Sequence, residues 1–278
     1  MAATDSKSVS FFPREHGATA MLLSPFVCAV ILARRFSLES IALEAAALIA
    51  TVFAFAVKDP LVAVFRQRFV WKQPHPETAV AWRWLAVEIP VLLACGAALL
   101  VHGPRREYAL LGLCEGAFGA LAVWMNVSNQ QRSEWFQVIS AVALAATSLA
   151  ACLAALGGIP LWGWVLWALC CLQASAAIFV VHARLDARVA THRTLSQPGS
   201  RRAAKIAIAG MAAAATAAVI LDFRWIISAA LLLAASGYTW ELRRQTDSAS
   251  LKMPLRRVGL QALALSSVYG ALLIIGLW

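Results

Sequence analysis

Charge is scarce in this sequence. Asp, Glu, Lys and Arg make up 14% of its 278 residues, hydrophobic residues make up 61%, and the mean hydropathy is +0.73. An ordinary soluble domain contains about 25% charged residues, so this composition excludes a chain that folds around a single core in water. Almost no residues remain between the long apolar runs, which excludes a separate soluble domain.

Several other patterns are missing. The six cysteines form no C-x-x-C pair and lie near no histidine at ligand spacing, so we interpret them as packing residues. The apolar runs do not alternate apolar and polar residues, which excludes a membrane β-barrel. The net charge of +10 comes from short loops between apolar runs, so no nucleic-acid partner is expected. The N-terminus lacks a cleavage pattern of small residues, and we expect no signal peptide.

The apolar runs themselves predict the fold. A bilayer core about 30 Å thick needs roughly 20 apolar residues per helical crossing, and backbone hydrogen bonds in lipid must be made within helices. We therefore predict an all-α polytopic membrane protein with about nine transmembrane helices in one domain, residues 17–278, preceded by a cytoplasmic or interfacial segment, residues 1–16. The predicted crossings are 17–34, 41–65, 79–101, 108–126, 136–156, 161–182, 203–221, 225–242 and 257–277.

The distribution of basic residues predicts the orientation. With the N-terminus inside, eighteen of the 24 Lys and Arg residues fall on the inside, five fall outside, and Lys58 lies within a helix. Because cytoplasmic loops are enriched in Lys and Arg, we expect the N-terminus inside and the C-terminus outside, in a bacterial inner membrane. The lipid bilayer is the expected partner; the sequence does not indicate an oligomeric state.

Ionisable side chains gather near the inside end of the predicted second helix. Lys58 and Asp59 lie within the helix beside Pro60, and Arg66 and Arg68 follow at its end. Charged groups in lipid are costly, so each needs a partner or a water-filled cavity. These residues are candidates for a site; the alternative is that Asp59 pairs with Lys58 or Arg66 only to neutralise charge.

The predicted sixth helix carries a similar set of groups. If this helix continues past the bilayer edge, His182, Asp186 and Arg193 lie on one face. Carboxylates in such a place would hold Mg²⁺ against a diphosphate, and Arg and Lys would contact the phosphate oxygens. We therefore predict Asp59, Asp186 and His182 as candidate catalytic groups, with Asp59 and Asp186 as candidate metal ligands. Local pairing of Asp186 with neighbouring Arg residues is the alternative.

Three further segments could border the same cavity. Residues 14–16 place Arg14, Glu15 and His16 just before the first helix, where they would line the cavity or act as a membrane-surface anchor. Asn126 belongs to a polar cluster at the end of the fourth helix. Glu88 and Glu115 lie deep in the third and fourth helices, as expected for a proton or cation path or for protonated carboxyls bonded to a neighbouring helix. The predicted ligand-binding residues are Arg14, Glu15, His16, Lys58, Arg66, Arg68, Asn126 and Arg193.

The opening segment carries a family resemblance. Residues 13–22, Pro-Arg-Glu-His-Gly-Ala-Thr-Ala-Met-Leu, resemble the signature that begins YwiC-like bacterial membrane proteins, and the overall length is similar. The resemblance implies a multi-spanning inner-membrane protein and no particular reaction.

The predicted architecture also looks like that of UbiA-type intramembrane prenyltransferases, whose second and sixth helices bind Mg²⁺ and an isoprenoid diphosphate through N-D-x-x-D-x-x-x-D and D-x-x-x-D. Here Ala63 and Gln67 occupy the later acidic positions of the first motif, and the second keeps only Asp186. The resemblance implies a UbiA-like scaffold, but fold resemblance alone does not transfer the reaction.

Three functions fit these features. We expect an isoprenoid or lipid-linked anionic ligand in a cavity open to the cytoplasm, with prenyl transfer possible only through degenerate Asp motifs. The alternative is a small-molecule or proton-coupled transporter with Glu88, Glu115 and Asp59 along its path. A third is an accessory subunit of a respiratory or redox assembly, although the histidines offer no defensible pair of haem ligands.

Overall fold

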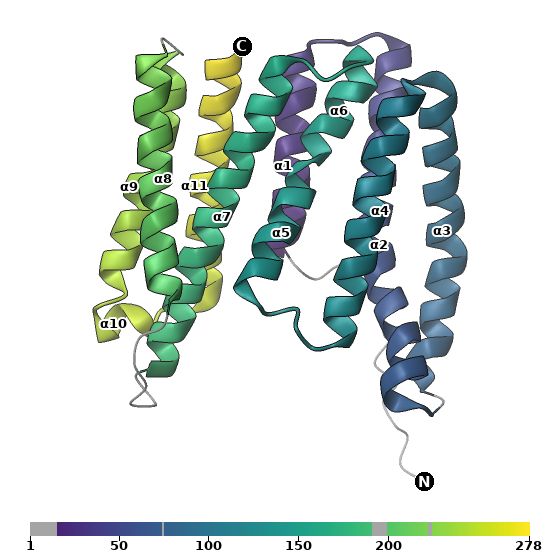
Figure 1. The fold of residues 1–278 in the computed structure, drawn as a ribbon, viewed down its shortest axis with the longest axis horizontal. Coiled ribbons are helices and arrows are strands. Elements are labelled where there is room, and N and C mark those ends of the chain that lie inside the picture. Colours follow the sequence, from purple (N-terminus) through teal and green to yellow (C-terminus); the bar gives the residue numbers. More distant parts are fainter. Residues whose placement is uncertain (1–15, 74, 191–198, 222–223) are drawn as a thin grey trace.

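A computed structural model describes residues 16–73, 75–190, 199–221 and 224–278, and within these ranges the chain is helical and contains no strand (Figure 1). A π-helical turn, Gln67–Trp71, continues α2. The helices are α1 (His16–Ala33), α2 (Leu38–Arg66), α3 (Pro76–His102), α4 (Arg105–Val127), α5 (Glu134–Ala145), α6 (Thr147–Leu156), α7 (Leu161–Ala190), α8 (Ser200–Ile220), α9 (Trp225–Arg244), α10 (Ser248–Leu251) and α11 (Leu255–Leu277).

The helices agree with the predicted crossings. Eight spans are long and apolar enough to cross a membrane, and α1 supplies a shorter apolar helix, Gly17–Ala33. One of the eight spans, Glu134–Leu156, consists of α5 and α6 together. The prediction of an all-α polytopic fold with about nine transmembrane helices is therefore confirmed.

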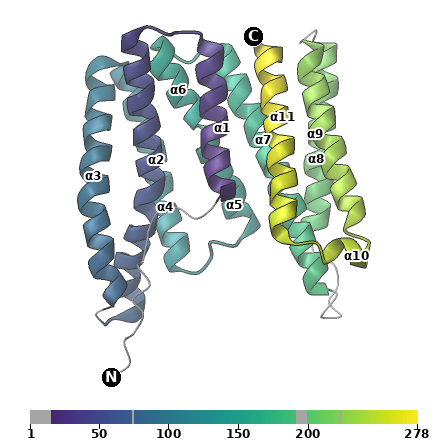
Figure 2. The ribbon, with the colours of Figure 1, turned by 180° about the vertical axis from the view of Figure 1, so that it is seen from behind.

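Successive long helices run in opposite directions, so the bundle has two distinct ends (Figures 1 and 2). We call one of them the basic end: α2, α4, α7 and α9 finish there, and α3, α5, α8 and α11 begin there. It is the lower end in Figure 1, and α10 lies at it. The Lys and Arg residues that we predicted to be inside, where the structure describes them, all lie at this end. The two ends of the bundle therefore differ in charge.

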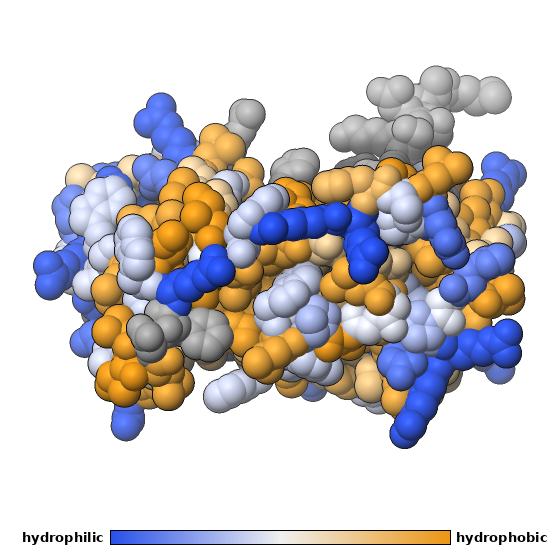
Figure 3. Space-filling view, turned by 90° about the horizontal axis from the view of Figure 1, so that it is seen from above, coloured by the Kyte–Doolittle hydropathy of each residue, from blue (hydrophilic) through white to orange (hydrophobic). Residues whose placement is uncertain are grey.

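The span formed by α5 and α6 is the most enclosed. Its apolar window is 61% buried, whereas the window of α4 is 11% buried and those of α3, α8 and α11 are each 17% buried. Helices that are apolar on their exposed faces suit a lipid environment. Figure 3 looks down from the end opposite the basic end and shows apolar residues (orange) reaching the rim of the molecule between separate hydrophilic side chains (blue).

A short break divides the central span. α5 ends at Ala145 and α6 begins at Thr147, whose hydroxyl donates a 2.7 Å hydrogen bond to the Leu22 carbonyl in α1. This bond ties the broken span to α1 in a buried part of the bundle, where an unpaired hydroxyl would be costly. We predicted one continuous crossing here, because residues 136–156 are predominantly apolar and the adjacent Thr147 and Ser148 do not by themselves indicate a break.

α7 is longer than predicted. The expected crossing ended at residue 182, but the helix continues without interruption to Ala190. Its last two turns therefore extend the side chains of residues 182–190 toward the basic end as one rigid element. The buried residues of α7 include Phe179, Ala183 and Ala187, so this extension packs against neighbouring helices.

Candidate functional site

Three ionisable side chains form what we call the intramembrane cluster: Lys58 and Asp59 of α2 and Glu88 of α3. The Lys58 Nζ lies 3.5 Å from Asp59 Oδ1, and Lys58 also lies over the Phe55 ring at 5.1 Å. Glu88 is only 2% exposed and lies on α3, which packs against α2. The predicted alternative of a pair between Lys58 and Asp59 is thus present, but a second carboxyl lies beside it.

The depth of this cluster follows from the hairpin of α2 and α3. Asp59 precedes the end of the π-helical turn by 12 residues, and Glu88 follows the start of α3 by 12 residues. At 1.5 Å per residue Asp59 lies about 10 Å deeper than Arg66 at the end of α2, and Glu88 lies about 8 Å deeper than the exposed Arg83 of α3, so both are within a bilayer core on its basic side. Pro60 and Pro90 lie inside the same two helices and provide no amide hydrogen to the carbonyl four residues earlier, which adds polarity at this depth.

Glu88 also has an incomplete set of partners. Its Oε2 atom is buried and has no hydrogen-bond partner among the described residues. Ionisable groups within a membrane are functional candidates because their insertion into lipid costs free energy, so they are found where they are paired or have a function. Glu115, predicted for the same path, takes part in no hydrogen bond or ion pair of the described chain.

Arg66 lies at the end of α2 and reaches across to the end of α4. Its Nη2 donates to the Asn126 carbonyl at 2.8 Å and to Asn129 Oδ1 at 3.3 Å. The Asn126 side chain bonds its own helix, donating to the Ala122 carbonyl at 2.9 Å. Sequence analysis paired Asp59 with Arg66 as one option, but the Arg66 bonds of the described chain run to α4. The Nε and Nη1 donors of Arg66 are not used in these bonds.

Arg68 follows on the π-helical turn and is exposed, as is Lys72, whose φ of 55° turns the chain toward α3. Phe65 and Phe69 stack at 5.9 Å between ring centroids and are 41% and 57% exposed. The end of α2 therefore presents basic side chains and exposed aromatic rings together. This combination is typical of a membrane–water boundary.

His182 and Asp186 form one polar face of α7, and this face contacts α5 and α8. His182 Nε2 lies 2.9 Å from Gln137 Oε1, and its Nδ1 lies 3.9 Å from the Glu134 carboxylate. The Ser200 hydroxyl, at the start of α8, contacts both Asp186 and Glu134. The side chain of His182 is 12% exposed. His182 and Asp186 are thus brought together, as their spacing predicted, but their partners are the first turns of neighbouring helices.

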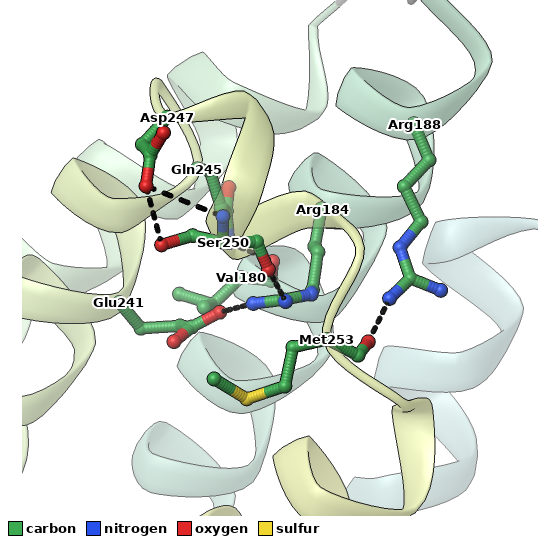
Figure 4. A network of polar contacts seen from close by, with 8 residues as sticks. All are labelled: Val180, Arg184, Arg188, Glu241, Gln245, Asp247, Ser250 and Met253. Carbon is green, nitrogen blue, oxygen red and sulfur yellow. Dashed lines mark hydrogen bonds and ion pairs between the residues drawn. The ribbon is translucent and has the colours of Figure 1, made fainter.

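The opposite face of α7 carries Arg184 and Arg188, and it anchors the connection around α10 (Figure 4). Arg184 contacts the Glu241 carboxylate of α9 and donates to the Ser250 carbonyl at 2.5 Å. Arg188 donates to the Met253 carbonyl. Nearby, Gln245 donates from Nε2 to the Val180 carbonyl at 3.1 Å. These bonds give Arg184 and Arg188 a clear structural role.

Asp247 caps the short helix α10 in the same region. Its carboxylate accepts hydrogen bonds from the amides of Ala249 and Ser250 and from the Ser250 hydroxyl. These bonds, with that of the Ala249 amide foremost, hold the pKa of Asp247 below its usual value. The carboxylate is therefore used locally and does not neutralise a distant arginine.

The described residues do not fit a magnesium ion held by the protein. They contain no group of three or more His, Cys, Asp or Glu side chains that could hold a metal ion. Lys58 pairs with Asp59, and Ser200 donates to Asp186, so both candidate ligands have other partners.

Some predicted site residues lie outside the described ranges. Arg14 and Glu15 precede them, and Arg193 falls in the gap between residues 190 and 199. His16 begins α1, but its side chain is not described. Sequence reasoning in turn missed Glu134, Ser200 and Glu241 as partners of α7. A charged or hydroxyl residue in a first helical turn is a weak signal, and nothing local in the sequence shows which distant helix it meets.

Comparison with protein families identifies the first half of the chain. The model of the YwiC-like protein family matches residues 12–153. The chain belongs to the YwiC-like family. Neither the curated proteins nor the solved structures give a significant match. The predicted membership is confirmed, and with the apolar helices it makes this YwiC-like chain a multi-pass integral membrane protein.

The match divides the candidate residues into two groups. Residues 12–153 include α1 to α5 and most of α6, and hence the intramembrane cluster, Arg66 and Asn126. The α7 residues and everything after them lie beyond the matched range. The family match therefore carries no information on α7 to α11 of this YwiC-like protein.

Proposed function

We propose that this YwiC-like protein binds an isoprenoid or other lipid-linked anionic ligand at the basic end, with the anionic head on Arg66. One observation carries the proposal: Arg66 is held by α4 through Nη2 alone, which leaves the N–H donors of its Nε and Nη1 atoms for a ligand. Nε and Nη1 lie on different sides of the guanidinium, so each can donate a charge-assisted hydrogen bond of its own to a phosphate or carboxylate oxygen, and an arginine fixed in advance loses less conformational entropy on binding.

The surroundings of Arg66 support a ligand that is both anionic and apolar. Arg68 and Lys72 follow it on and after the π-helical turn, are exposed, and have no ion-pair partner in the described part of the chain. The exposed rings of Phe65 and Phe69 provide apolar surface next to these cations. A lipid-linked phosphate combines the two properties, since its head needs cations and its chain needs apolar contact.

The remaining candidate residues have secondary parts in the proposal. Arg14, Glu15, His16 and Arg193 are proposed from the sequence alone as further contacts to the headgroup. Asp59 orients the ligand from within the membrane, and His182 and Asp186 position α7 through α5 and α8. We propose binding, in a bacterial inner membrane, and no catalysis. The acidic residues required for prenyl transfer through two magnesium ions are absent from α2 and α7.

The test compares Arg66→Gln with Arg83→Gln, an exposed arginine of α3 near the same end. Both variants are purified gently beside the unchanged protein, and the retained lipids and polyprenyl compounds are identified by mass spectrometry. Binding of geranylgeranyl diphosphate is then measured directly. We expect Arg66→Gln to weaken binding about tenfold or more and Arg83→Gln to leave it unchanged, since a hydrogen bond to a charged group contributes about 1.5–3 kcal/mol. Equal binding by the two variants contradicts the proposal.

A second candidate function is favoured by the intramembrane cluster. Glu88 is buried beside Asp59, and its Oε2 lacks a partner in the described part of the chain, so it suits the uptake and release of a proton. We propose proton-coupled transport as the alternative, with Asp59, Glu88 and Glu115 along its path.

This alternative is tested with protons as the probe. The protein is reconstituted in liposomes that contain a pH-sensitive dye, and the internal pH is followed after an external pH jump. The unchanged protein should accelerate equilibration over empty liposomes, Glu88→Gln should abolish the acceleration, and Glu107→Gln, an exposed carboxyl at the start of α4, should retain it. Asp186→Asn should also retain it. No acceleration by the unchanged protein rejects this function.

A further inference from the structure

A groove runs between α8 and α9 at the basic end, far along the chain from the intramembrane cluster. Its volume is about 290 Å³. Its walls are largely apolar and include Ile208, Ala212 and Leu242, whereas Arg201, Lys205 and Arg243 supply its charge. The groove belongs to the part of the chain beyond the YwiC-like match.

The spacing of residues along α8 separates charge from apolar surface. Arg201 and Lys205 are four residues apart in the first two turns, so they share one face of the helix. Ile208 and Ala212 continue the same face toward the middle of the bundle. At 1.5 Å per residue, Ala212 lies about 10 Å deeper than Lys205. The cations are thus at the mouth of the groove, and the apolar walls extend inward.

The three cations have no acidic partner in the described ranges. No ion pair there includes Arg201, Lys205 or Arg243, whereas Arg184 at the same end is paired with Glu241. Lys205 and Arg243 are exposed. Three unneutralised cations around a narrow mouth attract an anion, and the low polarity of the groove walls strengthens that attraction.

The surroundings place this mouth at the level of lipid headgroups. Trp240, one turn before the end of α9, is 55% exposed, and the Arg244 guanidinium lies 4.5 Å from the centre of its ring. Exposed tryptophan and arginine at a helix end are characteristic of the membrane–water interface. α8 is only 17% buried within the bundle, so its outer face is available to lipid.

We propose that the groove between α8 and α9 binds an anionic phospholipid of the surrounding bilayer, with the phosphate on Arg201, Lys205 and Arg243 and an acyl chain along Ile208 and Ala212. The occupant is a phospholipid because the charged mouth and the apolar interior lie in line, at headgroup depth, on a helix that faces lipid. The site does not depend on the ligand proposed for Arg66, because it is formed by different helices.

The first experiment measures lipid binding by native mass spectrometry of the full-length protein with phosphatidylglycerol and phosphatidylcholine. We expect phosphatidylglycerol to bind at least about tenfold more tightly, since each basic residue near an anionic headgroup adds a favourable contribution. The triple variant Arg201→Gln/Lys205→Gln/Arg243→Gln should lose this preference. The matched control Arg202→Gln/Lys252→Gln/Arg257→Gln removes three exposed cations of the same end outside the groove and should keep it.

A second pair of variants tests the apolar part of the groove and leaves all cations in place. Ala212→Trp fills the groove, whereas Ala213→Trp places the same side chain on the neighbouring exposed position. We expect Ala212→Trp to weaken phosphatidylglycerol binding about tenfold and Ala213→Trp to have little effect. Glycerol 3-phosphate at millimolar concentration should not displace the lipid.

Three results would overturn the proposal. Equal binding of phosphatidylglycerol and phosphatidylcholine would show that charge does not determine binding. An equal loss of phosphatidylglycerol preference in the two triple variants would show that the lipid does not bind in this groove. Full displacement by glycerol 3-phosphate would make the site one for a soluble anion. Because the second pair of variants retains every charge, poor folding of the triple variant still leaves a decisive comparison.

Discussion

Arg184 shows how a single residue connects the second half of the bundle. Its side chain is 3% exposed, and it contacts the Glu241 carboxylate, whose side chain is 14% exposed, as well as the Ser250 carbonyl. Removing one partner of a buried ion pair typically costs about 3–5 kcal/mol because the other charge stays buried. We predict that Arg184→Met markedly lowers the thermal stability of the purified protein and that Arg184→Met/Glu241→Leu recovers much of the loss. Arg257→Gln, on an exposed cation, should have little effect; a double variant no more stable than the single one contradicts this account.

The sequence predicted which residues share a helix face, but it did not predict their partners on other helices. His182 and Asp186 were expected to share a face of an extended helix, and they do. A pair of Asp59 with Lys58 or Arg66 was the alternative to a functional site, and Lys58 does pair with Asp59. Arg66, however, bonds α4 at Asn126, 60 positions along the chain. Helical periodicity determines which residues share a face, but which helix lies opposite depends on the packing of the whole bundle.

At the scale of elements, Gly237 allows α9 and α11 to approach closely. A Cβ atom at this position would lie 2.9 Å from Leu265 Cδ2, whereas a Cβ at Gly259 meets nothing within 4 Å. Small residues are favoured where membrane helices cross because they bring the backbones together. We predict that Gly237→Ile lowers the stability of the purified protein, as overpacking commonly costs about 1–3 kcal/mol, and that Gly259→Ile is tolerated. Adding Leu265→Ala should restore part of the loss, and equal melting temperatures for the two isoleucine variants would count against this packing.

The elements were largely predictable because lipid imposes a length of roughly 20 apolar residues on each crossing. The departures occur where composition gives no signal. The break between Ala145 and Thr147 lies in a predominantly apolar run, where the adjacent Thr147 and Ser148 are too weak a signal to predict it, and Thr147 donates to the Leu22 carbonyl in α1. The extension of α7 to Ala190 contains charged residues, which a hydropathy criterion excludes but which neighbouring helices satisfy.

At the scale of the whole molecule, the two ends of the bundle differ in charge. Eighteen of the 24 Lys and Arg residues belong to the segments assigned to the inside, and five belong to the opposite side. Because the helices alternate in direction, the described residues of the first set lie at the basic end and those of the second set lie at the opposite end. Both proposed anion sites lie at the basic end, so the orientation determines which leaflet supplies their ligands. Because positive charge resists translocation, we predict that this end faces the cytoplasm.

The orientation can be measured with single cysteines in a variant that lacks the six native ones. Arg106→Cys lies at the start of α4, opposite the basic end, and Lys252→Cys lies just after α10 at the basic end. In intact cells a membrane-impermeant maleimide should label Arg106→Cys strongly, and it should label Lys252→Cys only after lysis. The reverse pattern would invert the bundle. In that case the cations around Arg66 and at the α8–α9 groove would meet the outer leaflet, and a ligand supplied from the cytoplasm could not reach either site directly.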